Sequence, residues 1–139
     1  MKDAFGGIIN IALISVFLLI VSGILGLTVN YTKAFRMKNT VISAIEQYEA
    51  HGCFNSGDSD CKDKIKDGAS KFGYHPVSIN CKNYTAQIDN LFCYKENRTS
   101  NGNKYYSIVT QVDINIPIIN KMMGLSFFQV HGDTRVIKK

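Results

Sequence analysis

The stretch IINIALISVFLLIVSGILGLTV, residues 8–29, decides the architecture of this chain. It contains no acidic or basic side chain, and charged residues flank it, Lys2 and Asp3 before it and Lys33 and Arg36 after it. A helix that crosses the ~30 Å hydrocarbon core of a bilayer needs about 20 predominantly apolar residues. The stretch therefore predicts one membrane-spanning helix, and we assign residues 1–29 to a leader and transmembrane anchor.

Two other interpretations of the apolar stretch are a cleavable secretory signal and a buried helix of a soluble domain. A signal has an apolar region of roughly 7 to 15 residues that ends in a small-x-small cleavage site, whereas this stretch is longer and leads into Tyr31 and Lys33. A helix of a soluble domain would carry a polar stripe. Because only Asn10, Ser15, Ser22 and Thr28 interrupt the apolar surface, we favour the anchor.

The helical pattern continues beyond the anchor. Apolar residues recur at steps of three and four through Ala34, Met37, Val41 and Ile45, with polar residues between them. No proline or glycine interrupts residues 27–50. We predict one continuous helix from about Ala4 to Ala50, on the order of 70 Å long at 1.5 Å per residue, and a stop at His51-Gly52.

The remainder forms one small extracytoplasmic domain, residues 30–139, in which the helix continuation covers residues 30–50. A short helix is predicted at about residues 60–72, and the hydrophobic period then falls to two. Gly132 is expected to form a bulge or bend, and Pro117 to end a strand because it cannot donate to a ladder. The predicted sheet spans 75–138, with strands near 77–81, 88–95, 105–116 and 126–137 and an Asn-Gly turn within 97–103.

These elements predict an α+β fold. The amphipathic half of the helix needs an apolar surface to cover, and the alternating row Tyr106, Ile108, Val112 and Ile114 needs a lid. The helix and the sheet can therefore each cover the apolar surface of the other. We therefore expect the long N-terminal helix to pack on a small antiparallel sheet of about four strands.

The chain has four cysteines, and all of them lie outside the anchor. An even number in a small exposed domain predicts two disulfides, whereas a zinc site would bring cysteines in close pairs such as C-x-x-C. Three pairings are possible, and the sequence does not fix one. We favour Cys53 with Cys61 and Cys81 with Cys93.

Two signals disagree about which side of the membrane holds the domain. Lys33, Arg36 and Lys38 follow the anchor, and the positive-inside rule would place them in the cytoplasm. Disulfides require an oxidising compartment. We give the cysteines more weight, because the three basic residues lie on a helix that continues beyond the bilayer.

Composition and motifs argue against several functions. The net charge is +5, but lysine and arginine are scattered among acidic residues, so no basic stripe for nucleic acid is present. His51, His75 and His131 are far apart in the sequence, and no phosphate-binding loop or nucleophile elbow occurs. We predict no enzymatic activity, no cofactor and no metal site.

The layout of the whole chain resembles the type IV pilin superfamily, and within it the Tad-type minor pilins or pseudopilins (TadE-like proteins). The likeness rests on a short charged leader ending in Gly6-Gly7, a hydrophobic helix directly after it, an amphipathic continuation and a cysteine-bearing C-terminal sheet. The resemblance implies membrane insertion, sister subunits or pilus assembly proteins as partners, and leader processing near Gly6 or Gly7.

The sequence departs from the pilin pattern in one respect. Processed pilins usually carry a glutamate five residues beyond the cleavage point, but Ala12 or Ile11 stands there in this chain, and no carboxylate occurs between Asp3 and Glu46. A minor, initiating or uncleaved component is therefore favoured over a major pilin. The alternative hypothesis is a membrane-tethered extracellular binding or sensor domain with no filament role.

Ser22 and Gly26 are the candidate helix-packing residues of the anchor. They are four residues apart, the spacing at which small residues allow close helix approach in lipid. Contact with a partner helix on this face is one interpretation, and the ordinary tolerance of glycine in membrane helices is the other.

Overall fold

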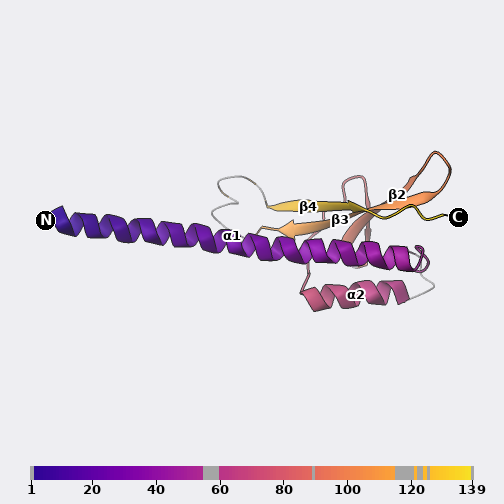
Figure 1. Ribbon diagram of the computed structural model, residues 1–139, viewed down its shortest axis with the longest axis horizontal. Coiled ribbons are helices and arrows are strands. Elements are labelled where there is room, and N and C mark those ends of the chain that lie inside the picture. Colours follow the sequence, from indigo (N-terminus) through magenta and orange to yellow (C-terminus); the bar gives the residue numbers. More distant parts are fainter. Residues whose placement is uncertain are drawn as a thin grey trace.

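A computed structural model, which describes residues 2–54, 60–88, 90–114, 121, 124 and 126–138, shows a long helix packed on a small antiparallel sheet (Figure 1). The predicted α+β fold class is confirmed. The strands follow one another as a meander in the order β1-β2-β3-β4. The elements are α1 (Lys2–Gln47), α2 (Asp60–Phe72), β1 (Thr85–Gln87), β2 (Phe92–Arg98), β3 (Lys104–Asp113) and β4 (Phe127–Asp133).

Helix α1 runs without a break from the bare N-terminal end into the domain (Figure 1). It ends at Gln47, three residues before the predicted stop at Ala50. The chain leaves the helix through Glu49 and Ala50, which have φ of 49° and 65°, and Gly52 follows at 69°. The amide of Ala50 donates to the carbonyl of Ile45 at 2.8 Å, so the left-handed residues close the helix by capping a free carbonyl.

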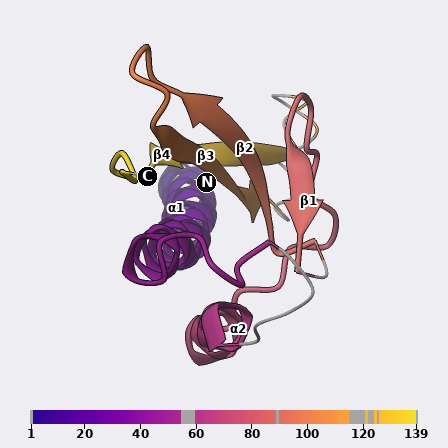
Figure 2. The same cartoon turned by 90° about the vertical axis from the view of Figure 1, so that its right-hand side faces the viewer.

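The core lies between the second half of α1, the inner face of the sheet and α2 (Figure 2). The helix contributes a stripe at the predicted three- and four-residue spacing, and all of its members are 0% exposed: Ala34, Met37, Val41, Ala44 and Ile45. Ile108 and Val112 face this stripe from β3, and Ile65 faces it from α2. Burying one such aliphatic side chain contributes about 1.5–3 kcal/mol, so this stripe fixes the domain to the helix.

Two glycines allow elements to approach α1 closely. A Cβ at Gly68 of α2 would lie 2.7 Å from Cγ2 of Thr40, and a Cβ at Gly132 of β4 would lie 2.9 Å from Cδ1 of Ile42. The bulge predicted at Gly132 is wrong, because the register continues through it as Ile108↔Gly132. The glycine is needed for packing against the helix instead.

The strand predicted at 77–81 is also wrong. Its backbone amides find side-chain acceptors: Val77 donates to Oδ2 of Asp113 at 2.8 Å, and Asn80 donates to Oε1 of Gln111 at 3.1 Å. These bonds replace a strand ladder, and Val77 is left 91% exposed. The first strand is β1 instead, and the segment before it covers the outer face of the sheet beside the buried Gln111.

The other strand predictions are correct in kind and shifted at their ends. Strand β2 begins four residues later than predicted, because Ile88 and Asn90 adopt positive φ. In β3 the predicted inner row from Tyr106 to Ile114 is buried. The last strand ends at Asp133, beyond which Ile137 forms an isolated bridge with Lys104. The predicted stop at Pro117 lies outside the described residues.

Candidate functional site

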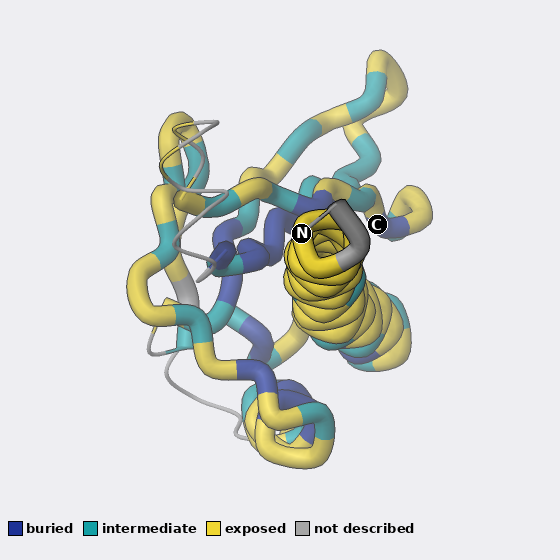
Figure 3. Tube along the Cα trace, turned by 90° about the vertical axis from the view of Figure 1, so that its left-hand side faces the viewer, coloured by how far each residue is buried: buried dark blue, intermediate teal, exposed yellow. Residues whose placement is uncertain are grey.

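The most prominent surface of the molecule is the first half of α1. Figure 3 shows this half as mostly exposed. Most of its large apolar side chains, from Phe5 to Val29, are between 54% and 68% exposed, and Val21 and Leu27 are partly buried. Within the described part of the chain, this helix is the one long and apolar enough to cross a membrane, and none of its apolar window is buried in the domain. The exposure argues against a helix of a soluble core and fits a single-pass membrane anchor.

Two polar side chains of this half, those of Ser15 and Thr28, are turned back onto their own helix. Ser15 Oγ donates to the carbonyl of Ile11 at 2.9 Å, and Thr28 Oγ1 donates to the carbonyl of Ile24 at 2.8 Å. Such bonds satisfy hydroxyls that have no water partner in lipid. Apart from Asn10 and Ser22, the surface offered by residues 8–29 is therefore apolar over on the order of 33 Å, at 1.5 Å per residue.

The structure places the candidate residues of the helix on its open surface and brings none of them to another element. Ser22 and Gly26 are exposed one turn apart. A Cβ at Gly26 would meet nothing within 4 Å, and the same holds for Gly6 and Gly7 in the first turns. Space for a partner helix therefore exists at Gly26, and the neighbour that would fill it is outside a single chain.

The four cysteines form the two disulfides that the sequence analysis favoured. Cys53 is bonded to Cys61 with a Cα separation of 5.0 Å, which ties the end of α1 to the start of α2. Cys81 is bonded to Cys93 with a Cα separation of 5.6 Å, which holds the segment before β1 on the sheet. Both bonds point to an oxidising compartment for the domain.

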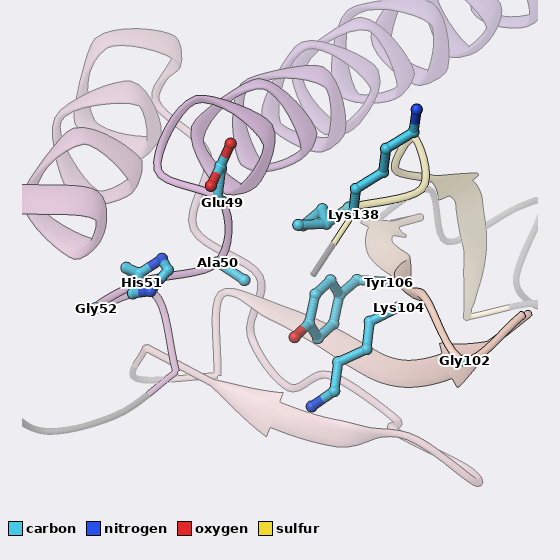
Figure 4. A pocket seen from close by; sticks show the side chains of 9 residues that line it. Glu49, Ala50, His51, Gly52, Gly102, Lys104, Tyr106 and Lys138 are labelled. Atoms are coloured by element: carbon cyan, nitrogen blue, oxygen red, sulfur yellow. The ribbon is translucent and has the colours of Figure 1, made fainter.

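A cleft of about 480 Å³ lies at the far end of α1. Figure 4 shows Glu49, Ala50 and His51 from the end of the helix on one side, and Lys104 and Tyr106 from β3 on the other. Sequence reasoning did not group these residues, because they come together only through the helix cap and the β2–β3 turn.

One of the charges that line the cleft, that of Lys104, is paired at its edge. Lys104 Nζ lies 3.0 Å from Oε1 of Glu96, and this hydrogen bond is the main cause that lowers the pKa of the Glu96 carboxyl. Burial, and next the Glu96 charge, raise the pKa of Tyr106. A protonated phenol beside a paired ammonium can bind a polar group, but it supplies no activated nucleophile.

The three histidines lie apart from one another and are exposed. His51 lines the cleft, His75 follows α2, and the ring of His131 meets Tyr84 at 6.3 Å. Among residues 2–54, 60–88, 90–114 and the described part of 121–138, no group of three His, Cys, Asp or Glu side chains could hold a metal ion.

Comparison with known proteins gives no match, whether with family models, curated proteins or solved structures.

Proposed function

We propose that this protein is a pilin-like subunit or assembly component of a bacterial Tad or type IV-like pilus, held in the membrane by α1 with its disulfide-bonded domain outside. The observation that carries the proposal is the division of α1. One half exposes apolar side chains on all sides, and the other half forms the backbone of the domain. A helix of this kind can rest in lipid before assembly and among sister helices afterwards.

Hydrophobicity alone does not drive the transfer of the helix from lipid to a bundle of sister helices. Lipid is as apolar as the interior of a helix bundle, so packing between small residues must supply the preference for sister helices. Ser22 and Gly26 meet this need, because they leave the helix surface open on one face. The absence of a carboxylate in the anchor favours a minor or initiating role over that of a major subunit.

Shearing of cells tests the proposal. The protein should be found both in the membrane and in sheared surface filaments. Enlarging the small face with Ser22→Leu and Gly26→Leu should remove it from the filaments and leave the membrane amount unchanged. Ile24→Phe, on the opposite face of the helix, is the matched control and should leave both fractions intact. Recovery of the wild-type protein from membranes alone would overturn filament membership.

A second candidate function is a tethered binding or sensor domain, and the cleft at Tyr106 favours it. The rings of Phe54 and Tyr94 stack at 4.1 Å beside Tyr106, so aromatic surface and a charged rim lie together. Loss of a cellular phenotype in Tyr106→Phe or Lys104→Ala, with filaments intact, would support this candidate over the first.

A further inference from the structure

The surface around α1 where it leaves the domain differs in character from the rest of the molecule. On the side of β4, three aromatic rings form a cluster: Tyr31 lies 6.3 Å from Phe35 and 5.7 Å from Phe128. All three are half-exposed, with exposed fractions of 40%, 41% and 37%. Lys38 Nζ lies 4.3 Å above the ring of Phe35, so an ammonium stands at the upper edge of this cluster.

On the side of α2, the same level of the helix carries a basic groove of about 340 Å³. Lys33 and Arg36 line it from α1, and Lys71 lines it from the last turn of α2. No carboxylate is among its lining residues, which also include Thr28, Val29, Thr32 and Phe72. We call the aromatic cluster (Tyr31, Phe35, Phe128) and the basic groove (Lys33, Arg36, Lys71) together the collar.

The level of the collar along α1 is fixed by the helix itself. Residue 29 ends the apolar stretch, and at 1.5 Å per residue Tyr31 lies about 3 Å beyond it and Phe35 about 9 Å beyond it. The headgroup region extends roughly 5 to 8 Å on each side of the hydrocarbon core. Tyrosine is enriched at this depth, so Tyr31 fits the headgroup region, while Phe35 lies at its outer limit; lysine or arginine there is attracted by anionic lipid.

We propose that the collar is a docking surface for anionic lipid headgroups of the membrane that holds α1. The aromatic cluster enters the interface, and the basic groove binds phosphate-bearing headgroups. Charge complementarity and continuity with the exposed apolar helix select this occupant. The docking also accounts for the position of Lys33 and Arg36, which the positive-inside rule alone would place on the other side of the membrane. This inference rests on membrane anchoring in the proposed function.

The chain contains no tryptophan, so a single introduced one reports on one place. The experiment uses the full chain in nanodiscs whose lipids carry bromine near the headgroup, with phosphatidylcholine alone or mixed with phosphatidylglycerol. Phe128→Trp keeps an aromatic ring in the cluster. Val77→Trp is a second reporter at an exposed site. The amide of Val77 donates to the side chain of Asp113, whose carbonyl accepts from Asn30 of α1, so Val77 lies close to the end of the apolar stretch. Val136→Trp, 44% exposed near the far end of α1, is the control. Leu19→Trp, near the middle of the apolar stretch, reports insertion in separate discs whose lipids carry bromine near the ends of their acyl chains.

With phosphatidylglycerol present, we expect the Phe128→Trp and Val77→Trp proteins to be quenched about twofold more than Val136→Trp. Replacing Lys33 or Lys71 by Glu should lower the ratio of docked to undocked protein by about fivefold or more for each residue. Neutral discs should give weaker quenching of both reporters.

The outcomes separate the two proposals. If Leu19→Trp is quenched while Phe128→Trp and Val77→Trp are quenched no more than Val136→Trp, docking is overturned and anchoring stands. If Phe128→Trp and Val77→Trp are quenched equally in neutral and anionic discs, the basic groove does not bind anionic headgroups. If Leu19→Trp itself escapes quenching, anchoring fails and the docking surface fails with it.

Discussion

The two halves of α1 share one backbone conformation and differ in what surrounds them. Residues 4–29, the lower half, are helical and mostly exposed, whereas residues 30–47, the upper half, are helical with one face fully buried. In the upper half, packing against the sheet and α2 stabilises the helix. The lower half has no such partner within the described chain, so its stability depends on the solvent around it. Lipid supplies an apolar solvent in which every backbone group must bond internally, as a helix does.

The largest expected difference between the two halves comes from a charge placed in the lower half of α1. Leu18→Asp should make membrane insertion less favourable by about 4 kcal/mol, since leucine at a helix centre favours insertion and aspartate opposes it strongly. The fraction of chains that resist alkaline extraction from membranes measures the effect. Asn39→Asp, at an exposed position of the upper half, should change nothing. Equal extraction of the two variants would show that the lower half is not in lipid.

The converse change acts on the upper half alone. Met37→Ala removes a fully buried side chain from the core and should lower the free energy of unfolding of the domain by about 3 kcal/mol through lost burial and a cavity. Denaturant unfolding of the domain in nanodiscs measures it. Met37→Leu, which nearly keeps the volume, should cost less than about 1.5 kcal/mol. Loss of membrane insertion in Met37→Ala would contradict the separation of the two halves.

The disulfide at the top of α1 sharpens the comparison further. Cys53 and Cys61 close a loop with a sequence separation of 8, and the Cys53→Ala/Cys61→Ala pair should destabilise the domain by about 2.5 kcal/mol by releasing the unfolded chain. The anchor should be unaffected. Mass spectrometry of the unreduced native protein is the accompanying measurement, and four free thiols would contradict an oxidising compartment.

Tyr74 gives the smallest expected effect, and it depends on pH. Its hydroxyl accepts a hydrogen bond from the amide of Gln111 at 2.9 Å and donates one to the carbonyl of the same residue at 3.1 Å. Gln111 lies on β3 beyond the residues that pair with β2. Burial is the main cause that raises the pKa of Tyr74 to about 12. The unfolded chain ionises first, so this contribution is intact below pH 10 and is lost as the pH rises from 10 towards 12, by about 2 kcal/mol.

Tyr74→Phe is the matched variant for that pH dependence. It should be less stable at neutral pH by about 1–2 kcal/mol, because a buried backbone amide and carbonyl lose their partner. It should also lack the part of the alkaline decline that Tyr74 contributes. Parallel unfolding curves of the two proteins from pH 9 to pH 12 would assign the decline to other groups.

Much of the fold could be predicted from the sequence, because it depends on periodic patterns. The stripe from Ala34 to Ile45 and the row from Tyr106 to Val112 in β3 are buried as their spacing predicts, although Val109 and Gln111 on the other face of β3 are buried too. The segment at 77–81 could not be predicted, because its alternation imitates a strand while Asp113 and Gln111, distant in sequence, take its amides. Side-chain acceptors of this kind leave no local pattern.

The candidate surfaces divide in the same way. The anchor is visible in the sequence as an uncharged apolar run, and Ser22 and Gly26 follow from it. The collar is not, since Phe128 reaches Tyr31 and Lys71 reaches the groove only when β4 and α2 have packed on α1. In the sequence alone, the three basic residues after the anchor indicate only the orientation of the chain in the membrane.

The most direct test of the central claim is the distance across the boundary between the two halves. Spin labels on non-natural residues at Leu18 and Asn39, both exposed, can be measured by pulsed electron resonance in nanodiscs with the disulfides intact. One continuous helix predicts a single narrow distribution near ~32 Å, from 21 residues at about 1.5 Å each. A broad or divided distribution would show a joint near Asn30 and would contradict the account.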